Sequence, residues 1–131
     1  HCPHYFTKET VMKFNILVAM IPSDQEESAI EEAKKAGAGS VTILNGKTIG
    51  LKEKKIFFGL TLEENVSLLL FILPQRLTMN VFKALRKKFH LSNHENNTEP
   101  KGLLFTIPLT HISGMEAQEV ELFEKEILDI L

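Results

Sequence analysis

The chain has 131 residues, with 15 basic and 17 acidic side chains and a formal net charge of -2 at pH 7. Its hydrophobic content of 44% and charged content of 24% are typical of a globular protein, and one domain is expected at this length. No apolar run reaches the roughly 18 residues of a membrane-spanning helix, and the near balance of charge disfavours general nucleic-acid binding. The single cysteine, Cys2, cannot close an internal disulfide, and we expect a cytoplasmic protein.

Breaks in the apolar pattern indicate where the first segments of secondary structure begin and end. Residues 1–11 show no periodicity and are expected to be a leader or tag-like segment, so that the domain begins at residue 12 and extends to 115. The apolar run from Phe14 to Ile21 predicts a buried strand. Ser23-Asp24-Gln25-Glu26 has the S-x-x-E form of a capping box, which predicts that a helix begins there.

This first helix is expected to pack closely on a sheet through small residues on one face and to close at Gly37, with the apolar positions Ala29, Ile30, Ala33 and Ala36. A second strand is predicted from Ser40 to Asn45. The pattern then disappears from Gly46 to Asn65. A connection of this length is usually functional or disordered.

The second half of the chain repeats the alternation of strand and helix. Val66 to Leu73 is almost continuously apolar and predicts a central strand, covered on both faces and ended by Pro74. A helix is predicted from Thr78 to Leu91, followed by a strand from Leu103 to Ile107. Residues 116–131 predict a C-terminal amphipathic helix that is acidic outside, with the apolar positions Ala117, Val120, Phe123 and Ile127.

Two strand–helix–strand units in series predict an α+β protein of the ferredoxin-like βαββαβ class, with a long loop between strands two and three and an added C-terminal helix. Right-handed crossovers place both helices on one face of the four-stranded sheet. The other face would be apolar and needs a cover, either from the added helix or from other subunits, so an oligomer is expected.

Short motifs lie in a fixed order around the long loop. They are Lys13 to Pro22 as the opening strand, Gly39-Ser40-Val41-Thr42 before strand two, Gly46 at the loop root, Lys101-Gly102 before the last strand, and Ser113-Gly114-Met115 as a closing turn. In this order and spacing the chain resembles the P-II nitrogen-regulatory signal proteins over roughly Phe14 to Met115.

The resemblance implies a homotrimeric signal-transduction regulator, not an enzyme, that binds ATP, ADP or another adenine nucleotide in clefts between subunits. Its long loop would control a target protein, either a membrane transporter or a metabolic enzyme, without nucleic-acid binding or membrane insertion. The implied nucleotide-binding residues are Ser40, Gly46, Lys47, Lys101, Gly102 and His111. The implied target-docking loop contains Lys52, Lys54, Lys55, Ile56, Phe57 and Phe58. No catalytic or metal site is expected.

Four departures from the family's pattern indicate that the chain is a divergent member. Gly46-Lys47-Thr48-Ile49-Gly50 lacks the family's loop glutamine, so binding of 2-oxoglutarate is not expected and the role of magnesium is open. The loop also has no tyrosine for uridylylation. Leu109-Thr110-His111-Ile112 replaces a pair of phosphate-binding arginines, and the second loop, residues 93–99, is acidic rather than glycine-rich.

Several of these residues also have plain structural explanations. Exposed lysines such as Lys47 and Lys101 are usually only solvated, and Gly46 after an asparagine can simply make a turn. The apolar triplet Ile56-Phe57-Phe58 either folds back as a short hairpin, packs on a neighbouring subunit, or forms a docking tip for a partner.

Two other classes of function are disfavoured. Single-stranded RNA binders with this strand order need aromatic and basic residues on the third strand, where only Phe71 is present. An acylphosphatase-like enzyme would need an arginine and an asparagine in defined loop positions, whereas the two arginines of the sequence, Arg76 and Arg86, both lie near the second helix. The alternative left open is a trimeric cation-tolerance-like protein of metal homeostasis or interaction, with no nucleotide ligand.

Overall fold

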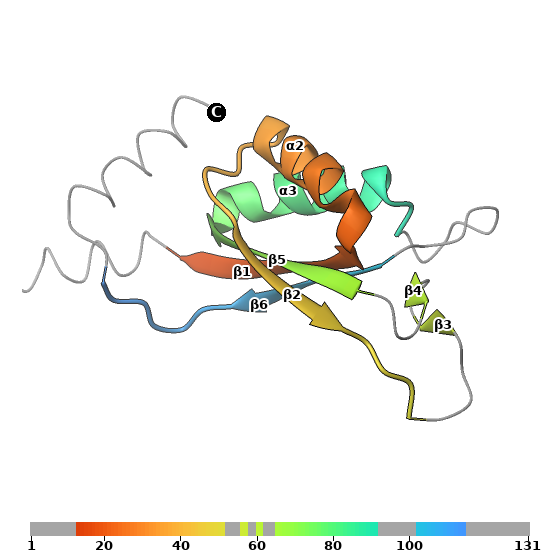
Figure 1. Ribbon diagram of the computed structural model, residues 1–131. Helices are drawn as coiled ribbons and strands as arrows, with labels where there is room; N and C mark the ends of the chain where they lie inside the picture. Colours follow the sequence, from red (N-terminus) through yellow and green to blue (C-terminus); the bar gives the residue numbers. More distant parts are fainter. Residues whose placement is uncertain (1–12, 52–55, 58–59, 62–64, 92–101, 115–131) are drawn as a thin grey trace, which may run out of the picture.

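The structure is a computed structural model that describes residues 13–51, 56–57, 60–61, 65–91 and 102–114. Two helices cover one face of a four-stranded antiparallel sheet (Figure 1). The elements are β1 (Phe14–Pro22), the short 3-10 turn η1 (Ser23–Gln25), α2 (Glu26–Lys35), β2 (Thr42–Lys47), β3 (Ile56–Phe57), β4 (Leu60–Thr61), β5 (Asn65–Pro74), α3 (Gln75–Lys88) and β6 (Leu103–Pro108). The predicted leader, residues 1–11, and the predicted helix over 116–131 lie outside the described residues.

The strand order of the main sheet is β2-β5-β1-β6, and every neighbouring pair is antiparallel. This order, with one helix in each crossover, confirms the α+β ferredoxin-like class. It also confirms that the apolar strand β5 is central. The long connection between β2 and β5 contains a separate two-stranded hairpin, β3 with β4. Among the described residues, no helix is both long and apolar enough to cross a membrane.

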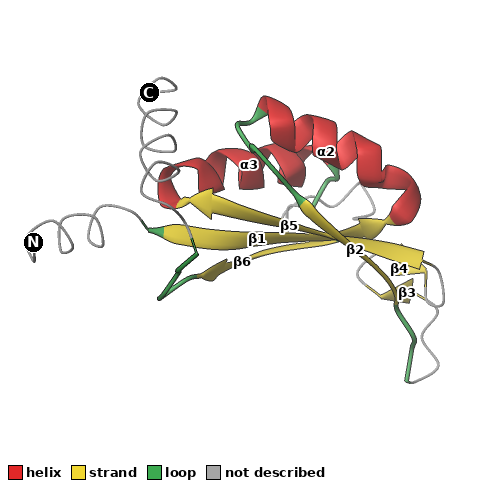
Figure 2. Ribbon diagram, turned by 60° about the vertical axis from the view of Figure 1, so that its left-hand side comes forward, coloured by secondary structure: helices red, strands yellow, loops and turns green. Residues whose placement is uncertain are grey.

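The hydrophobic core lies between the sheet and its two helices (Figure 2). Alternate residues of the two central strands point into it, because successive side chains of a strand face opposite sides. These residues are Leu17, Ala19 and Ile21 of β1 and Leu69, Phe71 and Leu73 of β5. Ala29 and Ala33 of α2 are fully buried against them, so the predicted close packing of small helix residues is confirmed.

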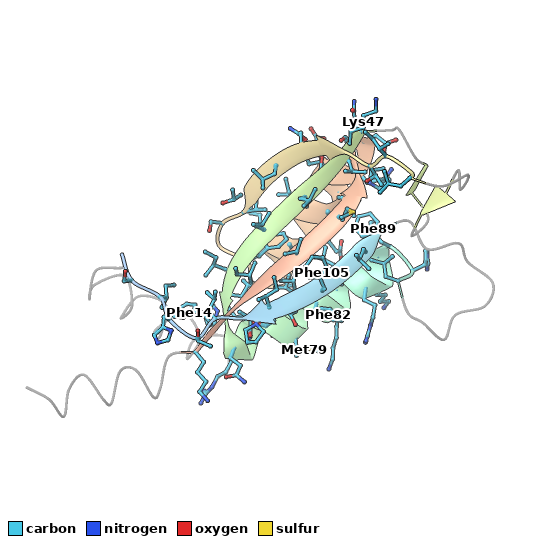
Figure 3. The ribbon with its side chains drawn as sticks, turned by 90° about the horizontal axis from the view of Figure 1, so that it is seen from below. Phe14, Lys47, Met79, Phe82, Phe89 and Phe105 are labelled. Atoms are coloured by element: carbon cyan, nitrogen blue, oxygen red, sulfur yellow. The ribbon has the colours of Figure 1, made fainter. Side chains whose placement is uncertain are left out.

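The opposite face of the sheet is also apolar, and no helix covers it in the described part of the chain (Figure 3). Its residues follow from the strand registers and are Ile16, Val18 and Met20 of β1, Leu68, Leu70 and Ile72 of β5, Leu44 of β2, and Leu103, Phe105 and Ile107 of β6. Leu44 and Ile72 remain about half exposed, at 52% and 51%. In the described part of the chain β5 is therefore covered on one face only, and we call this surface the open sheet face.

The predicted capping box at Ser23 is wrong. Ser23–Gln25 form a 3-10 turn, α2 begins at Glu26, and neither end of the turn has a side-chain cap. The Ser23 hydroxyl and the Glu26 carboxylate lie instead at Ser67 of β5, whose buried hydroxyl needs partners. A long-range contact thus replaces the local one that the sequence pattern indicates.

Helix α3 begins three residues earlier than predicted and ends three residues earlier. Pro74 leads directly from strand to helix, and the first helical amide, of Gln75, donates to the Lys13 carbonyl rather than to a capping side chain. At the other end, His90 adopts φ 55, and the amides of His90 and Leu91 bond the carbonyls of Lys87 and Arg86. This left-handed residue closes the helix. Gly37, at φ 114, closes α2 as predicted.

Candidate functional site

Two of the predicted nucleotide-binding residues lie at the root of the long loop. Gly46 and Lys47 are the last residues of β2, opposite Val66 and Asn65 of β5, because β2 extends two residues beyond its predicted end. Both are exposed. A Cβ atom added at Gly46 would meet no atom within 4 Å, so folding of a single copy does not require glycine at this position. The space above the Gly46 backbone is open to a ligand or to a neighbouring subunit.

Gly102 is required by the fold itself. It is buried at the start of β6 with φ 147, and a Cβ atom there would lie 2.5 Å from the Met20 carbonyl oxygen of β1. A side chain at this position would strain the backbone and collide with a neighbouring strand. Lys101, predicted to contact phosphate, lies outside the described residues.

Gly46 and Gly102 lie at the same end of the sheet but on its two outer strands. In the strand registers, Gly46 of β2 lies opposite Val66 of β5, which lies opposite Pro22 of β1. Leu103, next to Gly102, lies opposite Met20 of β1, two residues before Pro22. Because β5 and β1 separate β2 from β6, the two edges are about 14 Å apart at the usual strand spacing. One copy of the chain therefore does not bring these two groups together.

The remaining predicted residues lie elsewhere in the chain. Ser40 is exposed in the connection before β2. His111 is exposed beyond the end of β6, with Nδ1 3.1 Å from Thr110 Oγ1, and the preceding Leu109 amide donates to Phe14. Figure 3 shows Phe14 and Lys47 at opposite ends of the sheet, so His111 does not join Lys47 within one copy. The nucleotide roles of Ser40 and His111 stay predictions.

A polar cluster that the sequence reading missed holds the root of the loop. Ser67 of β5 is fully buried, and its Oγ lies within hydrogen-bond distance of Glu26 Oε2, of Ser23 Oγ at 3.2 Å and of Asn45 Oδ1 at 3.2 Å. A hydroxyl has one proton, so Ser67 donates to one of these three oxygens at a time, and the Glu26 carboxylate and the Asn45 side-chain oxygen can only accept. The available signal was Ser67 itself, the one polar residue within the apolar run from Val66 to Leu73.

This cluster joins the start of α2, the end of β2 and the start of β5. Asn45 is directly opposite Ser67 in the sheet, two residues before Lys47. A movement of the loop that shifts the end of β2 would therefore disturb the Ser67 bonds. Among the described residues, no buried side-chain nitrogen or oxygen lacks a hydrogen-bond partner.

Within the long loop, the backbone at Ile56 and Phe57 forms a short hairpin, which is one of the alternatives that the sequence left open for the apolar triplet. Ile56 pairs with Thr61 and Phe57 pairs with Leu60 in the small sheet of β3 and β4. The other predicted docking residues, Lys52, Lys54, Lys55 and Phe58, lie outside the described residues. In the part of the chain that the structure describes, no group of three or more His, Cys, Asp or Glu side chains is placed to hold a metal ion.

No family model and no curated protein matches this sequence. Solved structures do match in fold. CPII from Thiomonas intermedia K12, bound to ADP, AMP and acetate, superposes with a TM-score of 0.55 at 15% identity, over 74% of this chain and 86% of that one. The GlnK–ATP complex of B. subtilis gives 0.56 at 14% identity, over 75% and 83%. Arabidopsis thaliana PII bound to citrate gives 0.54 at 13% identity, over 75% and 78%. The chain therefore has the PII fold, which confirms the fold that the sequence resemblance implied.

Proposed function

We propose that this PII-fold chain is a divergent PII-like regulator that assembles as a homotrimer, binds an adenine nucleotide between subunits and acts on a target protein through its 48–64 loop. The observation that carries the proposal is the position of Gly46 and Gly102 at the same end of the sheet on opposite edge strands. The bound nucleotides of CPII and GlnK, namely ADP, AMP and ATP, support the choice of ligand.

A ring of subunits would complete such a divided site. In a heterologous, head-to-tail contact the surface of one subunit meets a different surface of the next, and a closing rotation gives a ring. The β2 edge of one copy then lies beside the β6 edge of its neighbour. This arrangement brings Gly46 and Lys47 of one subunit close to Gly102 of another, at each interface of the ring.

The open sheet face favours the same assembly. Exposed contiguous apolar surfaces on soluble proteins usually mark interaction sites. A trimer in which the sheets face one another would remove the side chains of Leu44, Ile72 and Ile107 from water, and these side chains are 52%, 51% and 44% exposed in a single copy. The assembly therefore accounts for an apolar face that the two helices leave uncovered.

The chemistry at the interface suits a phosphate group. The open backbone at Gly46 lets amide groups approach an anion, and the Lys47 ammonium adds a positive charge beside it. Lys101, next to Gly102 in sequence, would add a second charge from the neighbouring subunit. Phosphate binding near Lys47 would change the end of β2 and, through Asn45 and Ser67, the direction in which the loop leaves the sheet.

The test is a thermal-shift screen of the full chain against ATP, ADP and AMP, each with and without magnesium, together with light scattering for subunit number. A ligand that binds only the folded protein raises its stability by roughly 2.7 kcal/mol at a hundred times its dissociation constant. We expect a trimer that one nucleotide stabilises, with the shift lost in Lys47→Ala and kept in Lys35→Ala, an exposed control at the end of α2.

Each other outcome contradicts a defined part of the proposal. A trimer without any nucleotide response would exclude nucleotide sensing and keep the assembly. A trimer stabilised by copper or zinc instead would favour the cation-tolerance-like alternative. A monomer would exclude both the assembly and a site shared between subunits.

A further inference from the structure

Helix α3 presents a basic surface that the proposed function does not use. It contains five cationic side chains and no acidic one, whereas α2 contains four glutamates. Four of the five cations are exposed, and they are Arg76, Lys83, Lys87 and Lys88. The fifth, Arg86, places its guanidinium 5.7 Å from the centroid of the Phe82 ring. The basic charge of this helix thus faces outward.

Apolar side chains lie among these cations. Met79 is 48% exposed and Phe82 is partly buried, and Figure 3 shows both on the side of α3 that extends past the edge of β6. Residues three and four apart in a helix share a face. The outer side of α3 therefore carries a mixed apolar and basic surface, which we call the α3 strip and which consists of Arg76, Met79, Phe82, Lys83, Arg86 and Lys87.

Residues 116–131 of the same chain have the complementary composition. They contain six acidic side chains and one lysine. In helical spacing, Val120, Phe123 and Ile127 form the centre of an apolar stripe, with Glu119 and Glu124 on either side of it. Such a helix would place apolar residues against Met79 and Phe82 and carboxylates beside the cations of the α3 strip.

The chain also has a short path from β6 to α3. The Leu109 amide, just after β6, donates to the Phe14 carbonyl, and the Gln75 amide, the first of α3, donates to the Lys13 carbonyl. The end of β6 and the start of α3 are therefore held by two adjacent residues, Phe14 at the start of β1 and Lys13 just before it. At 1.5 Å per residue, a helix over 116–131 would be roughly 24 Å long and α3 is roughly 21 Å long.

We propose that residues 116–131 form an acidic amphipathic helix that packs along the α3 strip of its own subunit. The open sheet face is the other apolar surface within the described residues, but its positions carry no charged side chain, so it offers the carboxylates no cations. This docking does not depend on nucleotide binding. It masks the basic surface of α3 and leaves the open sheet face available to other subunits.

The test is hydrogen exchange of the full chain, measured by mass spectrometry, in a cycle of charge reversals. We expect the amides of 116–131 to exchange at least about tenfold more slowly in the wild-type protein than in Lys83→Glu/Lys87→Glu, because reversal turns attraction into repulsion. Added Glu119→Lys/Glu126→Lys should restore the protection. Lys34→Glu/Lys35→Glu on α2 is the matched control, with the same change of charge and no expected effect.

Carbodiimide cross-linking identifies the subunit involved. The reagent joins a lysine Nζ to a carboxylate as an amide with loss of water, so a mixture of isotope-labelled and unlabelled protein distinguishes links within one chain from links between chains. We expect links from Lys83 or Lys87 to 116–131 within one chain. Any of four results would overturn the proposal. These are a lack of protection of 116–131, protection that survives the α3 reversal, an equal loss of protection in the α2 control, and mixed-isotope links alone. The charge reversals on α3 should leave the thermal shifts with nucleotides unchanged. Failure of this docking proposal can therefore be distinguished from failure of the proposed function.

Discussion

At the scale of single residues, the two glycines of the candidate site have different reasons for being glycine. Gly102 has a positive φ and almost touches the Met20 carbonyl, so the packing of β6 on β1 demands the absence of a side chain. Gly46 has open space around it, and in one copy nothing demands glycine. Both were predicted as nucleotide-binding residues from the same resemblance. The structure gives Gly102 a role in folding, whereas the role of Gly46 depends on what approaches it.

Substitution to alanine separates these two roles. Gly102→Ala should lower the free energy of unfolding by about 2–4 kcal/mol, because the new Cβ adds backbone strain and a collision. Gly46→Ala should leave the unfolding of the nucleotide-free protein almost unchanged and weaken stabilisation by nucleotide. Urea unfolding measures the first effect and thermal shift the second. A large loss of stability in Gly46→Ala would mean that the loop root is packed more tightly than a single copy shows.

At the scale of secondary-structure elements, long-range contacts decide where the helices begin. Thr78 of α3 bonds the Pro74 carbonyl and accepts a hydrogen bond from the Asn15 side chain of β1, 3.1 Å away. Asn15, which interrupts the apolar run of β1, thus has a partner on the helix. The start of α2 is likewise held from outside, by Ser67 of β5.

The Ser67 cluster should contribute measurably to stability. Ser67→Ala removes the hydroxyl that bonds Glu26 at a buried position, and we expect a loss of about 1–3 kcal/mol in urea unfolding. Ser28→Ala, on the partly exposed part of α2, is the control and should change stability by less than about 0.5 kcal/mol. Equal effects of the two substitutions would show that the cluster does not hold the loop root.

At the scale of the whole molecule, the main question is what covers the open sheet face. The two helices cover the central strands on one side of the sheet, and the fold provides no second layer in the described residues. Ile72 lies in the central strand β5 yet is 51% exposed. An apolar residue at the centre of a sheet and open to water is typical of a surface that another subunit covers.

A charge on this face should therefore prevent assembly without unfolding the chain. Ile72→Glu costs little in an isolated copy, because the position is already half exposed, but it would bury a carboxylate in the trimer. We expect light scattering to report monomers. Met79→Glu, at a 48% exposed position of α3 on the other side of the sheet, should remain trimeric. Trimers of Ile72→Glu would indicate that subunits meet through another surface.

Apolar spacing by itself determined the α+β class, the order of elements, the central place of β5 and the small-residue face of α2, because these depend on periodicities of neighbouring residues. Gly37 was predictable for the same local reason. Only the tertiary structure decided that Ser23 and Glu26 lie at Ser67 and that α3 begins directly after Pro74, since their partners are far away in sequence. It also decided that Gly46 and Gly102 lie on opposite edges of one sheet, because strand order depends on how the crossovers pack and not on spacing along the chain.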